Sequence, residues 1–126
     1  MTESKKILII DDDPHCLQLY AVAIERAGYQ VTLADKKSKI TRAIENSTFD
    51  ILLIDLILPD MEASGIVGNF HKLNRNAKVI LITGYPELIS SINYLLESHI
   101  FEYLVKPISP NIIVQTINEA LKEEGK

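Results

Sequence analysis

The fold is decided by a short stretch, Ile51-Leu52-Leu53-Ile54-Asp55, in which four aliphatic residues run without interruption into a carboxylate. A strand with one face in water alternates apolar and polar residues, whereas a strand that is apolar at successive positions is covered on both faces. Strands of this second kind are typical of a parallel sheet with helices on both sides. Asp55 then marks the end of the strand, where the chain leaves the core.

Similar apolar runs recur along the chain, and each is followed by turn residues and a segment with helical spacing. This pattern predicts five strand-helix units in one domain that spans residues 1–126. We expect the second and fifth strands to lie at the edges because their apolar character is only partial. The predicted strands are Ile7–Ile10, Gln30–Leu33, Ile51–Ile54, Val79–Ile82 and Tyr103–Val105.

The segments between the strands predict helices. For the first helix, Asp13 is a suitable N-cap, Pro14 suits the first turn, and Gly28 can end the helix in a left-handed conformation. Because strand-helix-strand crossovers are almost always right-handed, helices must lie on both faces of the sheet if the first strand is near its centre, and we expect a doubly wound α/β fold with a five-stranded parallel sheet. The later helices are predicted near Ser38–Asn46, Ser64–Leu73, Glu87–Glu97 and Pro110–Glu124.

Composition excludes several classes of protein. Hydrophobic residues make up 47% and charged residues 24% of the 126 residues, which is an ordinary globular balance. No apolar stretch approaches the roughly 20 residues that cross a bilayer, so we expect a cytoplasmic protein that does not bind membranes. The net charge of −4 argues against direct nucleic acid binding, which needs a concentrated set of Lys and Arg.

Polar side chains follow four of the predicted strands. Asp11 and Asp12 follow the first, Asp55 the third, Thr83 the fourth and Lys106 the fifth. Ligands of doubly wound sheets bind at this end of the strands, so we expect these side chains to converge. Clustered carboxylates raise one another's pKa unless a cation neutralises them, and an oxygen-only ligand set favours Mg²⁺. A hydroxyl and an ammonium would complete a set that holds an anionic tetrahedral group beside a carboxylate.

Each of these features has a plainer interpretation when taken alone. An acidic run before a helix commonly caps that helix, a carboxylate after a strand is often a turn residue, and a lysine before a proline is often a surface residue. The coincidence of all of them at strand ends, in the right order, favours a functional site.

Four segments carry a family resemblance that covers nearly the whole chain. The sequence resembles the receiver domains of bacterial response regulators, and this resemblance implies a flavodoxin-like (βα)5 fold with the strand order 2-1-3-4-5. The matching segments are Ile7–Pro14 with its acidic pair, Phe49–Met61 with the acceptor strand and loop, Val79–Gly84 with the switch hydroxyl, and Glu102–Pro107 with the Lys-Pro signature.

The resemblance also implies a chemistry. Asp55 would accept a phosphoryl group from a histidine kinase or a histidine phosphotransfer protein in a two-component phosphorelay. Asp11, Asp12 and Asp55 would hold Mg²⁺ together with the main-chain carbonyl of Ile57. The protein would not be an enzyme acting on a separate substrate, although it would assist its own phosphorylation and dephosphorylation.

Further residues would form the switch that the resemblance implies. Lys106 would contact the phosphoryl group, Thr83 would move toward it, and Tyr103 would rotate inward to fill the vacated space. The Lys106-Pro107 bond is expected to be cis. The output would be altered binding of an unknown protein or domain through the fourth helix, fifth strand and fifth helix, a face that could also form a homodimer.

The chain departs from the family pattern in places. Met61-Glu62-Ala63 stands where the family usually has glycine after Met-Asp, so we expect the loop after Asp55 to take a different path. The bulk of Ile57 and Tyr85 predicts a phosphoryl group that is hydrolysed slowly.

Two other functions stay open at this point. One is a receiver-like interaction module that works without phosphorylation. The other is a haloacid-dehalogenase-like phosphohydrolase, because Asp11-Asp12-Asp13 contains an Asp-x-Asp pair. Against the second, no acidic pair follows the fourth strand and Asp55 would be idle. The sequence also leaves open whether the domain stands alone or belongs to a longer regulator or hybrid kinase.

Overall fold

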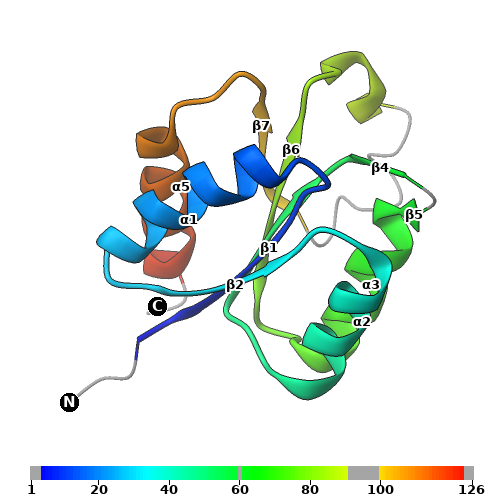
Figure 1. The fold of residues 1–126 in the computed structure, drawn as a ribbon. Helices are drawn as coiled ribbons and strands as arrows, with labels where there is room; N and C mark the ends of the chain where they lie inside the picture. Colours follow the sequence, from blue (N-terminus) through cyan, green and yellow to red (C-terminus); the bar gives the residue numbers. More distant parts are fainter. Residues whose placement is uncertain (1–3, 60, 91–99, 124–126) are drawn as a thin grey trace.

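A computed structural model describes residues 4–59, 61–90 and 100–123, and it shows a five-stranded parallel sheet between two layers of helices (Figure 1). The strand order is β2-β1-β3-β6-β7. Since β6 and β7 are the predicted fourth and fifth strands, the doubly wound fold and its order are confirmed. The elements in chain order are β1 (Lys6–Ile10), α1 (Pro14–Arg26), β2 (Gln30–Ala34), α2 (Lys37–Asn46), β3 (Ile51–Asp55), β4 (Ile57–Leu58), β5 (Met61–Glu62), α3 (Ala63–Leu73), β6 (Lys78–Thr83), a 3₁₀ helix (Pro86–Leu88), β7 (Ile100–Val105) and α5 (Pro110–Glu123).

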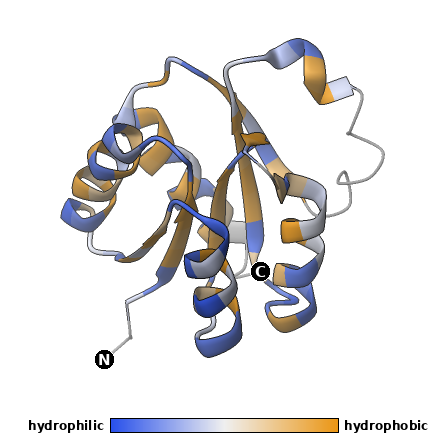
Figure 2. Cartoon of the chain, turned by 45° about the vertical axis from the view of Figure 1, so that its right-hand side comes forward, coloured by the Kyte–Doolittle hydropathy of each residue, from blue (hydrophilic) through white to orange (hydrophobic). Residues whose placement is uncertain are grey.

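The core lies on both faces of the sheet. Side chains of Ile7–Ile10, Ile51–Ile54 and Val79–Ile82 are at most 2% exposed, as their continuous apolar sequences predict. Helices α2 and α3 cover one face, and α1 and α5 cover the other. Figure 2 shows hydrophobic strands inside and hydrophilic outer helix surfaces. Among the described helices, none has the length and apolar character that a bilayer span requires.

Helix α1 begins and ends as the sequence predicts. The Asp13 side chain accepts a hydrogen bond from the His15 N–H at 2.9 Å, and Pro14 occupies the first turn. Gly28, with φ of 100°, takes the left-handed conformation after the helix. Asp13 and Pro14 fix where α1 starts, and therefore hold the acidic segment before it at the end of β1.

The last strand is longer than predicted. Strand β7 begins at Ile100 rather than Tyr103, and its pairing with β6 contains a register shift between Val79 and Ile80. Phe101 is the extra residue, because Val79 pairs with Ile100 and Ile80 with Glu102. The bulge breaks the alternation of side chains and so conceals the start of the strand in the sequence.

A small hairpin was also missed. Strands β4 and β5 pair in antiparallel fashion shortly after Asp55, with Leu58 opposite Met61 and Ile57 opposite Glu62. The predicted helix Glu87–Glu97 lies largely outside the described residues, and Pro86–Leu88 form a 3₁₀ helix.

Candidate functional site

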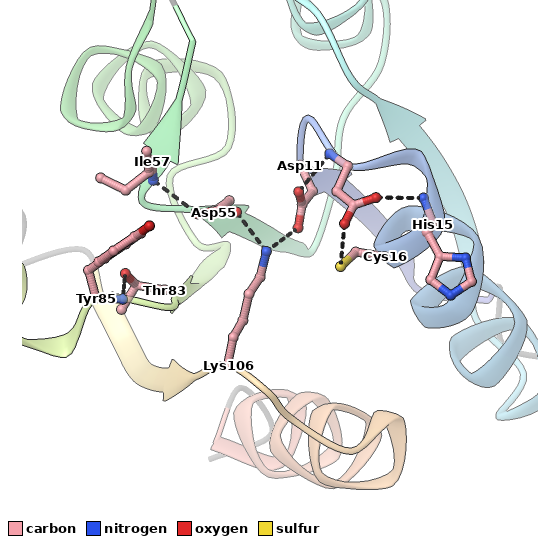
Figure 3. Close-up of polar contacts among 9 residues, drawn as sticks. Asp11, His15, Cys16, Asp55, Ile57, Thr83, Tyr85 and Lys106 are labelled. Atoms are coloured by element: carbon pink, nitrogen blue, oxygen red, sulfur yellow. Dashed lines mark hydrogen bonds and ion pairs between the residues drawn. The ribbon is translucent and has the colours of Figure 1, made fainter.

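The predicted site residues meet at the carboxyl ends of the strands. Lys106, which follows β7, donates hydrogen bonds from Nζ to Oδ2 of Asp55 at 2.8 Å and to Oδ2 of Asp11 at 3.0 Å. Figure 3 shows the lysine reaching between the two carboxylates. The expectation that the ends of the first, third and fifth strands converge is therefore confirmed in the fold.

Both carboxylates are held by the main chain as well. Oδ1 of Asp11 accepts from the Asp13 N–H at 3.0 Å, and Oδ1 of Asp55 accepts from the Ile57 N–H at 2.9 Å. Each aspartate thus closes a turn with the residue two positions later, which fixes its side chain. Asp11 is only 2% exposed and Asp55 only 7%, so these hydrogen bonds compensate for lost hydration.

The electrostatics of the site follow from this burial. Burial raises the pKa of Asp11 and the charge of Asp55 adds to the rise, while the Asp13 N–H and Lys106 oppose it. Burial alone would lower the pKa of Lys106, but hydrogen bonds to Asp55 and Asp11 outweigh it and leave the pKa raised. The ammonium therefore stays charged and partly neutralises the acidic cluster.

The acidic cluster fits a hard divalent cation. Asp11, Asp12 and Asp55 each offer a carboxylate oxygen, and these three atoms lie within 4.8 Å of one another. Two of the residues are buried and Asp12 is exposed, so a bound ion would keep access to water. Oxygen ligands of this number suit Mg²⁺ with several retained waters. The main-chain carbonyl of Ile57 stays a predicted ligand.

Thr83 lies beside the cluster at the end of β6 and is fully buried. Its hydroxyl accepts a hydrogen bond from the Tyr85 N–H at 2.9 Å, and its carbonyl accepts from the Lys106 N–H at 2.8 Å. The Lys106-Pro107 bond is cis, as predicted. Tyr103 is half-buried against the side of the core that α2 and α3 cover.

A hollow of about 340 Å³ opens over the cluster. Ile57 and Tyr85 line this hollow and are 45% and 55% exposed. Large, mostly apolar side chains therefore lie beside the charged residues of the site. Leu58, Pro59 and Gly84 belong to the segments that carry the family resemblance, but no role was predicted for them. The lining residues are Asp12, Asp55, Ile57, Leu58, Pro59, Gly84, Tyr85 and Lys106.

The class of protein follows from comparing this doubly wound sheet and its acidic strand ends with known families. Residues 7–118 match the model of the response regulator receiver domain, and the chain belongs to this family. It is thus a phosphorylatable receiver domain of two-component signalling, as predicted.

Individual relatives support the same assignment. A CheY-like receiver domain protein from Methanospirillum hungatei JF-1 is 35% identical, with a TM-score of 0.87 and 98% of each chain covered. The transcriptional regulatory proteins GlrR of Escherichia coli K12 and ZraR of Klebsiella oxytoca are 24% and 28% identical over 94% of this chain. The chain spans only 27% of the length of either regulator.

Proposed function

We propose that Asp55 is the residue that accepts the phosphoryl group, from a histidine kinase or a histidine phosphotransfer protein in the cytoplasm. The observation that carries this proposal is the position of its carboxylate, which both lines the hollow and pairs with Lys106. Of the other two acidic residues, Asp11 pairs with Lys106 but is not among the residues that line the hollow. Asp12 lines the hollow, but Lys106 hydrogen-bonds to the other two carboxylates.

In the reaction, a carboxylate oxygen of Asp55 attacks the phosphorus of a phosphohistidine. The new O–P bond forms as the N–P bond breaks, and the electron pair of that bond returns to the imidazole nitrogen. Lys106 shifts its hydrogen bond from Asp55 to a phosphoryl oxygen, while the Ile57 N–H keeps the other oxygen of Asp55 oriented. Bound Mg²⁺ would be held by Asp11, Asp12 and Asp55 and would supply charge neutralisation.

The added phosphoryl group would act as a switch, because it brings roughly −1.5 to −2 charge. In this proposal the Thr83 hydroxyl, whose oxygen accepts from the Tyr85 N–H, donates its proton to a phosphoryl oxygen, and Tyr103 turns inward. The face formed by the predicted fourth helix, β7 and α5 would then change its affinity for an output protein or for a second copy. The domain acts on itself and has no separate substrate.

Intact mass measurement after incubation with acetyl phosphate tests the assignment. With Mg²⁺ we expect a gain of one phosphoryl group in the wild type, no gain in Asp55→Asn, and little gain in Asp11→Asn. Asp50→Asn is the matched control, because Asp50 precedes the same strand at its opposite end and accepts from the Lys6 N–H at 2.8 Å. It should take up phosphate as the wild type does.

Two other results would contradict the proposal. Uptake in none of the proteins would favour an interaction module that works without phosphorylation. Steady release of inorganic phosphate that requires Asp11 but not Asp55 would favour a phosphohydrolase.

A further inference from the structure

The two edges of the sheet are protected to different degrees. Strand β7 carries the register shift at Phe101 and a charged residue, Glu102, and both features discourage pairing with another strand. Strand β2 reads Gln-Val-Thr-Leu-Ala from Gln30 to Ala34, with no charge and no proline, and all five residues pair with β1 in unbroken register. Regular and uncharged edges of this kind are open to strand addition.

The backbone groups at the β2 edge can be assigned from its hydrogen bonds. Gln30 N–H donates to the Lys5 carbonyl at 2.9 Å, and the Ala34 carbonyl accepts from the Asp11 N–H at 3.3 Å. Backbone groups of successive residues alternate in direction along a strand, so those of Val31 and Leu33 face away from β1. Within residues 4–59, 61–90 and 100–123, no strand pairs with β2 on that outer side.

An apolar groove of about 430 Å³ runs beside this edge, between α1 and β2. Val22 of α1 and Leu33 of β2 line it and are 42% and 40% exposed. Ala21 and Val31 line the same groove. Removing these side chains from water would favour any partner that pairs with the strand.

We propose that β2 pairs in antiparallel fashion with β2 of a second copy of this chain. The twofold axis passes between the two Thr32 residues, so Val31 of one copy faces Leu33 of the other. In this register the outward N–H and carbonyl groups of Val31 and Leu33 exchange hydrogen bonds, and all five residues of each strand find a partner. Since both copies keep α1 on the same face, each α1 lies along the groove beside the other.

The charges at the ends of the groove favour a second copy over another occupant. Helix α1 runs opposite to β2, because it connects two parallel strands. The groove therefore has Glu25 at one end and Lys39, which pairs with Asp35 at 3.4 Å, at the other. A twofold axis places Glu25 of each copy near the Lys39–Asp35 ion pair of the other, where the Lys39 ammonium would lie between two carboxylates.

Cysteine cross-linking tests this register directly. Thr32 of one copy would face Thr32 of the other in a non-hydrogen-bonded pair, where the Cα atoms are about 4.5 Å apart. A disulfide spans Cα distances of about 4.4 to 6.8 Å, so cysteines at this position could be cross-linked. In a Cys16→Ser background, Thr32→Cys should form a covalent dimer on oxidation. Thr41→Cys is the matched control, because Thr41 is an exposed threonine of α2 that lines the hollow between α2 and α3 and not the groove beside β2. It should form no covalent dimer on oxidation.

Sedimentation velocity then measures non-covalent association of the protein without cross-linking. Leu33→Pro removes one outward N–H and spares the pairing with β1, and Thr32→Lys places two like charges at the axis. Each should weaken association by about tenfold or more, whereas Thr41→Lys should not. Circular dichroism checks that each variant is folded.

Some outcomes would overturn the proposal. They are a wild type that stays monomeric throughout a concentration series, and a dimer that survives both Leu33→Pro and Thr32→Lys. Asp55→Asn should associate like the wild type, so failure of the phosphoacceptor assignment and failure of this interface are distinguishable.

Discussion

The middles of β1, β3 and β6 differ from the carboxyl ends of the same strands. In the middles every side chain is aliphatic and at most 2% exposed. Within one residue of the last aliphatic position the chain presents Asp11, Asp55 and Thr83, which are almost as buried but are hydrogen-bonded to main-chain N–H groups or to Lys106. In this domain the middles of the strands therefore supply the apolar core, and the ends of the strands supply the polar site. Buried charges lie where the turns provide hydrogen-bond donors.

The largest expected effect is on stability in the middle of a strand. Leu52 is fully buried in β3, so Leu52→Ala should lower the free energy of unfolding by about 2 to 5 kcal/mol. Phosphoryl uptake per folded molecule should not change, because the site lies at the end of the strand. Urea denaturation and intact mass measure the two properties.

The matched control for this substitution is Leu73→Ala. Leu73 is 56% exposed, and its loss should change the free energy of unfolding by no more than about 0.5 kcal/mol. A folded Leu52→Ala protein that no longer takes up phosphate would show that the middle of β3 contributes to the chemistry at its carboxyl end.

A smaller effect is expected at the ends, from metal binding. At roughly a hundredfold above its dissociation constant, Mg²⁺ should raise the free energy of unfolding by about 2.7 kcal/mol. Asp11→Asn should lose this increase and Asp50→Asn should keep it, since Asp50 stands at the amino end of β3. Thermal unfolding with and without Mg²⁺ measures the difference.

The pH dependence of that increase sharpens the test. Burial raises the pKa of Asp11 above its ordinary value of 3.8. Without metal, Asp11 therefore favours the folded state below pH 3.8, and this contribution is lost as the pH rises through the raised pKa. The stabilisation by Mg²⁺ should grow over the same rise in pH, because the ion binds the ionised carboxylate. Stabilisation independent of pH across this window would contradict the role of Asp11.

The smallest effect is expected at Asp12. Its carboxylate is exposed and lies within 4.8 Å of those of Asp11 and Asp55, so repulsion of roughly 0.5 to 1 kcal/mol is relieved by Asp12→Asn in the absence of metal. Urea denaturation should show a small gain in stability that shrinks as salt is added, because salt screens exposed charges. A loss of stability in this metal-free variant would show that the carboxylates at the strand ends do not repel one another.

Much of the fold and the site could be predicted because two signals are local. Continuous apolar runs such as Leu52 and its neighbours identify buried parallel strands, and the next residue of such a run must lie at one edge of the sheet. Asp11, Asp55 and Lys106 were placed together by this logic alone. The sequence did not predict that Lys106 would hydrogen-bond to both carboxylates, since that depends on the exact reach of one side chain.

Other features have no pattern that could be read in advance. Strands β4 and β5 have two residues each, which is too short for alternation to show. The start of β7 was missed because Ile100 and Tyr103 pack on one side of the sheet although they are three residues apart. Regular alternation would put them on opposite sides.

The bulge at Phe101 has a consequence for how this strand tolerates change. It shifts the phase of the side chains by one, so Tyr103 lies on the side of α2 and α3, and Phe101 and Leu104 lie on the side of α1 and α5. Deletion of one residue at the bulge would restore even alternation and force Ile100 or Tyr103 onto the opposite side of the sheet. Deletion of one residue in β7 therefore changes the face that β7 and α5 help to form more than many substitutions would, even though each remaining residue keeps its identity.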